Sequence, residues 1–156
     1  MPIDVLGFDH VDLTVTHLER SRAFYSRVLG ELGFGPAPDP GDGFVLHNGL
    51  TSIGLHAATQ PGAVDRSRPG LHHLALRAAA RADVDAYHDF LCRHDVRILD
   101  PPAEYPQYGK DYYAVFFSDP DEIKLELVHF PWGYWAPAMT DGRDPRPRYP
   151  RGRKRA

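Results

Sequence analysis

The stretches FDHVDLTV at residues 8–15 and LHHLALRA at residues 71–78 decide the fold, because the second repeats the pattern of the first. Each has a histidine at its third position, His10 or His73, within nearly alternating apolar and polar residues. Each is followed by an amphipathic helical pattern and then by further strand-like segments. Such a repeat indicates two similar supersecondary units that pack against each other.

Alternation with period two predicts that residues 8–15 form a strand with one apolar face and one polar face. His10, Asp12 and Thr14 lie on the polar face. The same reasoning along the chain predicts helices over residues 18–32 and 83–94, and it places further strands near residues 44–48, 51–58, 71–78, 96–99, 112–117 and 123–129.

Local signals predict where these elements begin and end. Thr16 and Glu19 have the spacing of a capping box, which starts the first helix. Gly30 or Gly33 is expected to end that helix, because glycine tolerates the left-handed conformation of a C-cap. Pro101–Pro102 is expected to close the strand before it, since proline cannot donate to a sheet.

The order of elements predicts two halves and a tail. The first module is expected over residues 1–58, a linker rich in proline, glycine and charge over 59–70, and the second module over 71–130. A Pro/Arg-rich C-terminal tail follows at 131–156. A chain of 156 residues fits two such halves packed as one domain.

Composition narrows the class of protein. The formal net charge of -3 argues against a nucleic-acid partner, and the basic residues 141–156 are read as a solvated end. A lone Cys92 excludes an intrachain disulfide and favours a cytoplasmic protein. We expect no secretion signal and no membrane partner, because the sequence lacks a signal-peptide start and any long apolar run.

Four residues with metal-binding side chains are expected on polar strand faces: His10, His56, His73 and Glu126. His56 lies in LHA at residues 55–57 and Glu126 in LEL at residues 125–127, and these two segments occupy matching positions near the ends of the two halves. If the halves pack as a pair, these side chains can converge. Imidazole nitrogen and carboxylate oxygen suit zinc, nickel, iron(II), manganese or cobalt. Two histidines and a carboxylate leave positions open for water and substrate, as a catalytic metal requires.

The sequence resembles the vicinal oxygen chelate superfamily, which includes glyoxalases, bleomycin resistance proteins and extradiol dioxygenases. The resemblance rests on FDHV at residues 8–11, AFYSRVLG at 23–30, LHHLA at 71–75 and FSDPDEIKLE at 117–126. The last of these motifs is the most specific. The family usually has glycine where this chain has Glu122, so a small difference in that turn is expected.

The resemblance implies an α+β fold in which two βαβββ modules form a cup-shaped mixed sheet with helices on its outer face. It implies one divalent metal per site, of unknown identity, which binds a small substrate through two neighbouring oxygens and stabilises an oxyanion or enediolate. By position, His10, His73 and Glu126 match the family's common ligands. His56 matches a fourth position, where glyoxalase I has a glutamate.

Departures from the family pattern argue against a glutathione substrate: Thr14 and His56 stand where glyoxalase I has arginine and glutamate. Fosfomycin transferases have threonine where this chain has Asp12. The first hypothesis is therefore a metal-dependent lyase or isomerase of the glyoxalase type, with Glu126 as ligand and proton shuttle. Two alternatives stay open: an iron(II) extradiol-type dioxygenase and a metal-free drug-binding resistance protein.

Substrate contacts are predicted for four further residues: Asp12, Arg77, Lys124 and Tyr112. The first three share the expected cup face with the ligands, and Tyr112 is a candidate for the tyrosine that the family's dioxygenases place near oxygen. A homodimer is expected, since family members commonly pair. The site then forms within one chain or, with halves exchanged, between two.

Overall fold

The computed structural model describes residues 7–37, 43–60 and 62–131, and it has the expected α+β fold. In the first module the elements follow the order β1 (His10–Val15), α1 (Leu18–Glu31), β2 (Gly35–Pro36), β3 (Phe44–His47) and β4 (Ser52–Ala57). In the second module they follow the order β5 (Leu74–Arg77), α2 (Arg81–Arg93), β6 (Ile98–Glu104), β7 (Tyr113–Ser118) and β8 (Lys124–His129).

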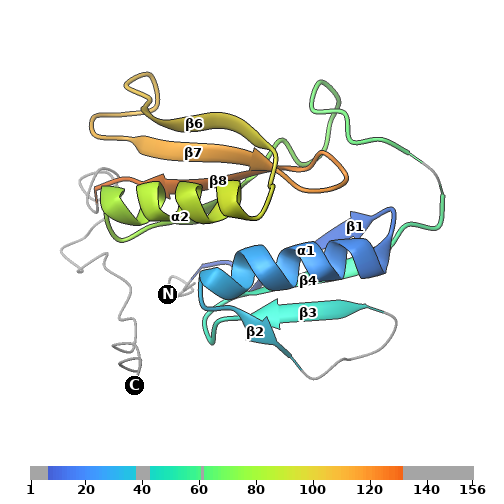
Figure 1. Ribbon diagram of the computed structural model, residues 1–156. Coiled ribbons are helices and arrows are strands. Elements are labelled where there is room, and N and C mark those ends of the chain that lie inside the picture. The colour runs from blue at the N-terminus through green and yellow to red at the C-terminus, as the bar shows by residue number, and fades with distance from the viewer. Residues whose placement is uncertain (1–6, 38–42, 61, 132–156) are drawn as a thin grey trace, which may run out of the picture.

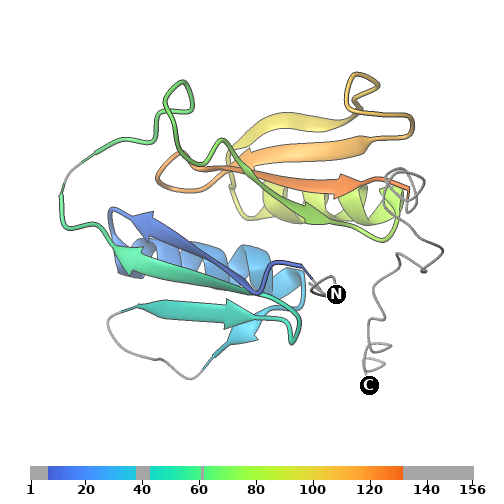
Figure 2. The same cartoon turned by 180° about the vertical axis from the view of Figure 1, so that it is seen from behind.

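The two modules have the same topology. The strand orders are β1-β4-β3-β2 and β5-β8-β7-β6, and only the first pair in each sheet is parallel. Both helices lie on one side of the sheets (Figure 1), and the opposite side is turned toward the viewer in Figure 2. The two sheets remain separate, so a single chain does not close one continuous cup.

The strand faces alternate as the sequence predicted. On β1, Leu13 and Val15 are buried beneath the helices, whereas Asp12 and Thr14 are exposed on the other face. One apolar core runs beneath both helices and includes residues from both modules. We call the sheet surfaces turned away from this core the open faces.

Two details of the first module differ from the predictions. The helix begins at Leu18, and its N-cap His17 makes no side-chain capping bond, so the predicted capping box is wrong. The Thr16 hydroxyl instead donates to Asp121 of the second module. The C-terminus of α1 is as expected, because Gly33 follows it in the left-handed region at φ 87°. The two-residue strand β2 has too few residues to show a period and was not predicted.

The prediction that Pro101–Pro102 ends a strand is also wrong. Strand β6 continues through both prolines to Glu104. The prolines are accommodated because β6 is an edge strand, and its register against β7 shifts between Asp100 and Ala103. In the turn before β8, Glu122 has φ 67°, the left-handed conformation that favours glycine, so this glutamate adopts a backbone that a glycine would take easily. The expected difference from the family in this turn stays a prediction.

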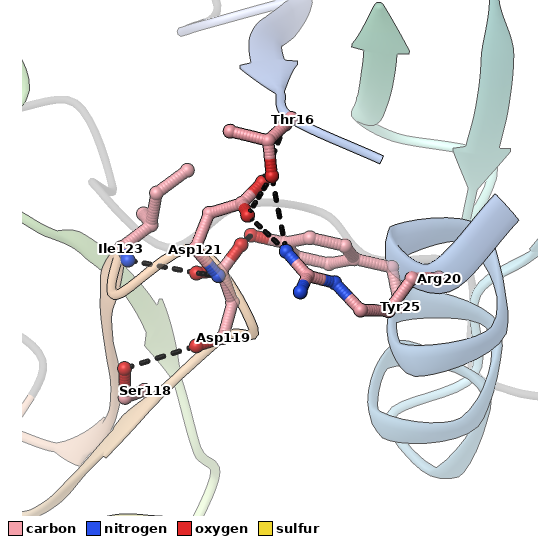
Figure 3. A network of polar contacts seen from close by, with 7 residues as sticks. All are labelled: Thr16, Arg20, Tyr25, Ser118, Asp119, Asp121 and Ile123. Atoms are coloured by element: carbon pink, nitrogen blue, oxygen red, sulfur yellow. Dashed lines mark hydrogen bonds and ion pairs between the residues drawn. The ribbon is translucent and has the colours of Figure 1, made fainter. Parts of the chain in front are cut away.

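The modules are joined where the turn between β7 and β8 meets the start of α1 (Figure 3). The Tyr25 hydroxyl donates to Asp119 Oδ2 at 3.0 Å, and Arg20 pairs with Asp121. The Thr16 backbone N–H also donates to Asp121, at 2.7 Å. We call these five residues the module joint.

Asp119 is the centre of the joint. Only 5% of the residue is exposed, and its Oδ1 accepts the backbone N–H groups of Asp121 and Ile123 at 2.8 and 2.7 Å. Burial raises the pKa of this carboxyl despite those bonds. The hydrogen bond that Asp119 accepts from the other module comes from the Tyr25 hydroxyl, and it connects the turn to α1.

Within residues 7–37, 43–60 and 62–131, no helix combines the length and the apolar character needed to cross a membrane. The predicted module boundaries and linker remain predictions. All but the first residue of the predicted tail lies outside the described residues.

We expect Tyr25→Phe to lower the free energy of unfolding by about 1–2 kcal/mol, because it removes one buried hydrogen bond and leaves Asp119 under-satisfied. Urea denaturation followed by circular dichroism measures this loss. The matched control is Tyr113→Phe, which removes an exposed tyrosine–aspartate bond of 2.6 Å within the second module. Equal losses in the two variants would contradict a special role for the joint.

Candidate metal half-sites on the open faces

Glu126 lies on the open face of the second module. Strand β8 buries Leu125 and Leu127 in the core beneath the helices, so period two turns Glu126 to the opposite face. Ala75 of β5 lies beside it in parallel register. The residue has no exposed surface, although it is ionisable. A buried carboxylate is costly for stability and is typical of a functional group.

The two oxygens of Glu126 have different surroundings. Oε1 accepts a hydrogen bond from the Tyr112 hydroxyl at 2.5 Å. Oε2 lies 3.1 Å from His73 Nε2 and forms no hydrogen bond with any residue that the structure describes. Burial raises the pKa of this carboxyl, while the Tyr112 hydrogen bond opposes the rise. One oxygen is thus fixed, and the other is free to bind a ligand.

His73 presents its Nε2 to this free oxygen. Its Nδ1 lies 2.7 Å from Nδ1 of His72, so the neighbouring residue fixes the ring. Burial lowers the pKa of His73, and the nearby charges of His72, Lys124 and Arg66 act in the same direction. The neutral imidazole is the form that binds metals.

The first module repeats this arrangement around His10. Its Nδ1 is 2.9 Å from Oδ1 of Asp9, again the preceding residue, and its Nε2 is 4.0 Å from Oδ2 of Asp12. The Asp9 hydrogen bond raises the pKa of His10. His56 Nε2 is 3.6 Å from the same Asp12 oxygen. Gly54 provides the room, since a Cβ there would lie 2.1 Å from Asp12 Oδ1.

The predicted ligands therefore form two half-sites, His10 with His56 and His73 with Glu126. Among the described residues, no group of three or more His, Cys, Asp or Glu side chains is placed to hold a metal. The donors nevertheless fit a divalent cation, because Glu126 Oε2 is buried and unpartnered beside an imidazole nitrogen. Nδ1 of His10 and Nδ1 of His73 are also held by the preceding residue, much as metal-ligating histidines are held by a partner on their second nitrogen.

The predicted substrate contacts fall into two groups. Asp12 and Tyr112 touch the half-sites themselves. Lys124 shares the open face of β8 with Glu126, and its Nζ lies 3.8 Å from Oδ2 of Asp100. Arg77 donates to the backbone oxygen of Phe130 at 2.6 Å, which gives it a structural contact.

Sequence reasoning missed Asp9 as a partner of His10 and His72 as a partner of His73. The signal was present, since each residue directly precedes its histidine in the repeat. It also missed Asp121 as a link between modules, because residues 105 positions apart in the sequence give no local pattern.

A cavity of about 590 Å³ lies between the modules, along one edge of β5, and is distinct from the half-sites. Its lining includes Phe34, Leu76 and Tyr87, and none of the four predicted ligands.

Comparison with known proteins identifies relatives over nearly the same span. Residues 7–127 match the Glyoxalase/Bleomycin resistance protein/Dioxygenase superfamily. The uncharacterized protein YqjT of Bacillus subtilis (strain 168) is 34% identical over 122 residues, which cover 76% of this chain and 95% of YqjT.

Two solved structures are also similar. A candidate glyoxalase from Bacillus halodurans is 34% identical with a TM-score of 0.67, over 79% of this chain and 95% of its own. A glyoxylase/bleomycin resistance protein/dioxygenase domain from Frankia sp. EAN1pec is 26% identical with a TM-score of 0.67, over 85% and 97% of the two chains.

We expect Glu126→Gln to stabilise the protein at neutral pH after chelators have removed any metal. The raised pKa means that the folded state binds the proton more tightly than the unfolded state, so ionised Glu126 destabilises the fold above its folded pKa. A glutamine stays neutral and still accepts the Tyr112 hydrogen bond. Thermal unfolding across pH measures the gap between the two proteins, which should close as pH falls through the folded pKa. A constant gap would argue against this account.

Proposed function

The chain belongs to the Glyoxalase/Bleomycin resistance protein/Dioxygenase superfamily, and from this membership we propose that it is a divalent-metal-dependent enzyme of the glyoxalase type. Its reaction is a lyase or isomerase step on a small molecule that binds through two neighbouring oxygens. The observation that carries this proposal is the buried Glu126, whose Oε2 faces His73 Nε2 at 3.1 Å without a hydrogen bond. That arrangement is unfavourable in the metal-free chain and becomes favourable with a cation between the two groups.

His73 and Glu126 would hold the metal from the second module, with His10 and His56 from the first. A bound divalent cation acts as a Lewis acid and stabilises negative charge on substrate oxygen. Glu126 is also the group that moves a proton, because its raised pKa suits a carboxyl that must accept and return one. Tyr112 holds Oε1 and leaves Oε2 as the reactive atom.

A second copy of the chain supplies the missing half of each site in this proposal. Strands β1 and β5 are edge strands, so each has a free edge for pairing. Phe8 and Leu71, at equivalent positions just before the two strands, are 89% and 44% exposed, which suits burial in an interface. His10 and His56 of one copy would then meet the second-module pair of the partner.

A cytoplasmic location also belongs to this proposal, since Cys92 is free. The absence of nucleic-acid and membrane partners remains a prediction from composition.

Metal analysis of protein purified without added metal tests the proposed cofactor. We expect about one divalent ion per chain by mass spectrometry, and at least a tenfold weaker affinity in Glu126→Ala, because a primary ligand is lost. Lys124→Ala on the same strand face is the control and should keep its metal. Redox-active iron would direct assays to the dioxygenase alternative. Protein that takes up no metal on titration would contradict both enzyme hypotheses and leave the drug-binding one.

Mixed dimers test the shared site. His10→Ala and Glu126→Ala should each bind metal poorly alone. Unfolding and refolding them together should restore tight binding at about a quarter of the sites, because half of the dimers combine one intact site with one doubly impaired site. Refolding each variant alone is the control. If the mixture recovers nothing while both refold, each site lies within one chain.

A further inference from the structure

Three tyrosines from one loop line the open face of the second module. The connection between β6 and β7 carries Tyr105, Tyr108 and Tyr112, and it is held closed by a hydrogen bond of 2.9 Å from the Tyr105 N–H to the Tyr112 carbonyl. The rings of Tyr105 and Tyr108 stack at 5.9 Å with an angle of 20°, and Tyr108 lies 5.3 Å from Tyr112. We call these three residues the tyrosine wall.

The wall stands on two buried phenylalanines and reaches the proposed metal ligand. Tyr105 packs edge-on against Phe116 at 5.2 Å, and Tyr112 lies 5.2 Å from Phe130. Both phenylalanines are less than 5% exposed. The Tyr112 hydroxyl then bonds Glu126, so the wall and the half-site form one continuous surface.

The outermost ring of the wall faces solvent. Tyr108 is 55% exposed, although an aromatic ring loses stability by facing water. An exposed, pre-stacked ring beside a ligand group is typical of a surface that binds another flat ring.

A positive charge lies at the base of this surface. Lys124 Nζ is 3.8 Å from the centre of the Phe116 ring and 3.8 Å from Asp100 Oδ2. Its side chain is only 17% exposed, and it lies two residues before Glu126 on the same strand face. This ammonium favours a ligand whose oxygens carry negative charge.

We propose that the substrate is a planar aromatic compound with an anionic oxygen next to a second oxygen, its ring stacked on the tyrosine wall. The placement of the oxygens at His73 and Glu126 rests on the proposed function. The ring site does not, because it consists of the chain's own aromatic side chains.

Two probes with the same oxygens and different rings test the proposal: 2-hydroxybenzoate and 2-hydroxycyclohexanecarboxylate. Calorimetric titration of the full-length protein, metal-free and then metal-loaded, should show the aromatic compound binding about tenfold more tightly, the effect of roughly 1.4 kcal/mol of ring stacking. Tyr108→Ala should reduce the preference to about twofold, whereas Tyr108→Phe should keep it, because the ring and not the hydroxyl acts.

Tyr113→Ala is the control outside the wall, since that side chain bonds Asp85 on α2, and it should keep the full preference. Equal binding of the two probes, or binding of neither, in both forms of the protein would overturn the proposal. A ring preference without metal uptake would uphold the ring site and reject the proposed enzyme. Metal uptake without a ring preference would be consistent with the proposed enzyme and would reject the ring site.

Discussion

The buried carboxylate of Asp119 is the centre of the polar joint between the two modules, which also share one apolar core. Each module pairs its own strands and covers them with its own helix. The turn that contains Asp119 lies in the second module, yet its oxygen binds the hydroxyl of Tyr25 on α1. A further polar contact, from the Tyr87 hydroxyl to the backbone oxygen of Val28, links the two helices. The join lies entirely on the helix side of the sheets.

The candidate site lies on the opposite side of the sheets. The open faces hold both candidate half-sites, and the tyrosine wall occurs on only one of them. In both modules the residue before the histidine contacts its Nδ1. The side chains around the two histidines differ. In the first module the surroundings are small and charged, as around Asp12 and Gly54. In the second they are aromatic and dry, as around Glu126. The two faces thus differ in polarity, although their backbones correspond.

Much of this was predictable from periodicity. Alternation on β1 and β8 correctly assigned Leu13 and Leu125 to the core and Glu126 to the opposite face, because strand geometry links sequence position directly to direction. Predictions failed where a distant partner decided the outcome. Thr16 was predicted to cap the first helix, but its hydroxyl bonds Asp121. Pro101 and Pro102 were predicted to end a strand, but they lie within β6 at the edge of its sheet. The pairing of His72 with His73 depends on ring orientation, which no pattern encodes.

The positions of proline in the strands determine where each sheet can grow. The outer edge strands are β2 and β6, and they contain Pro36, Pro101 and Pro102. Ala37 donates inward to Val45, so the nitrogen of Pro36 faces the outer side and offers no donor to an added strand. The inner edge strands β1 and β5 contain no proline. The chain therefore resists open-ended polymerisation at its outer edges and restricts any sheet extension to β1 and β5, the strands that carry His10 or follow His73.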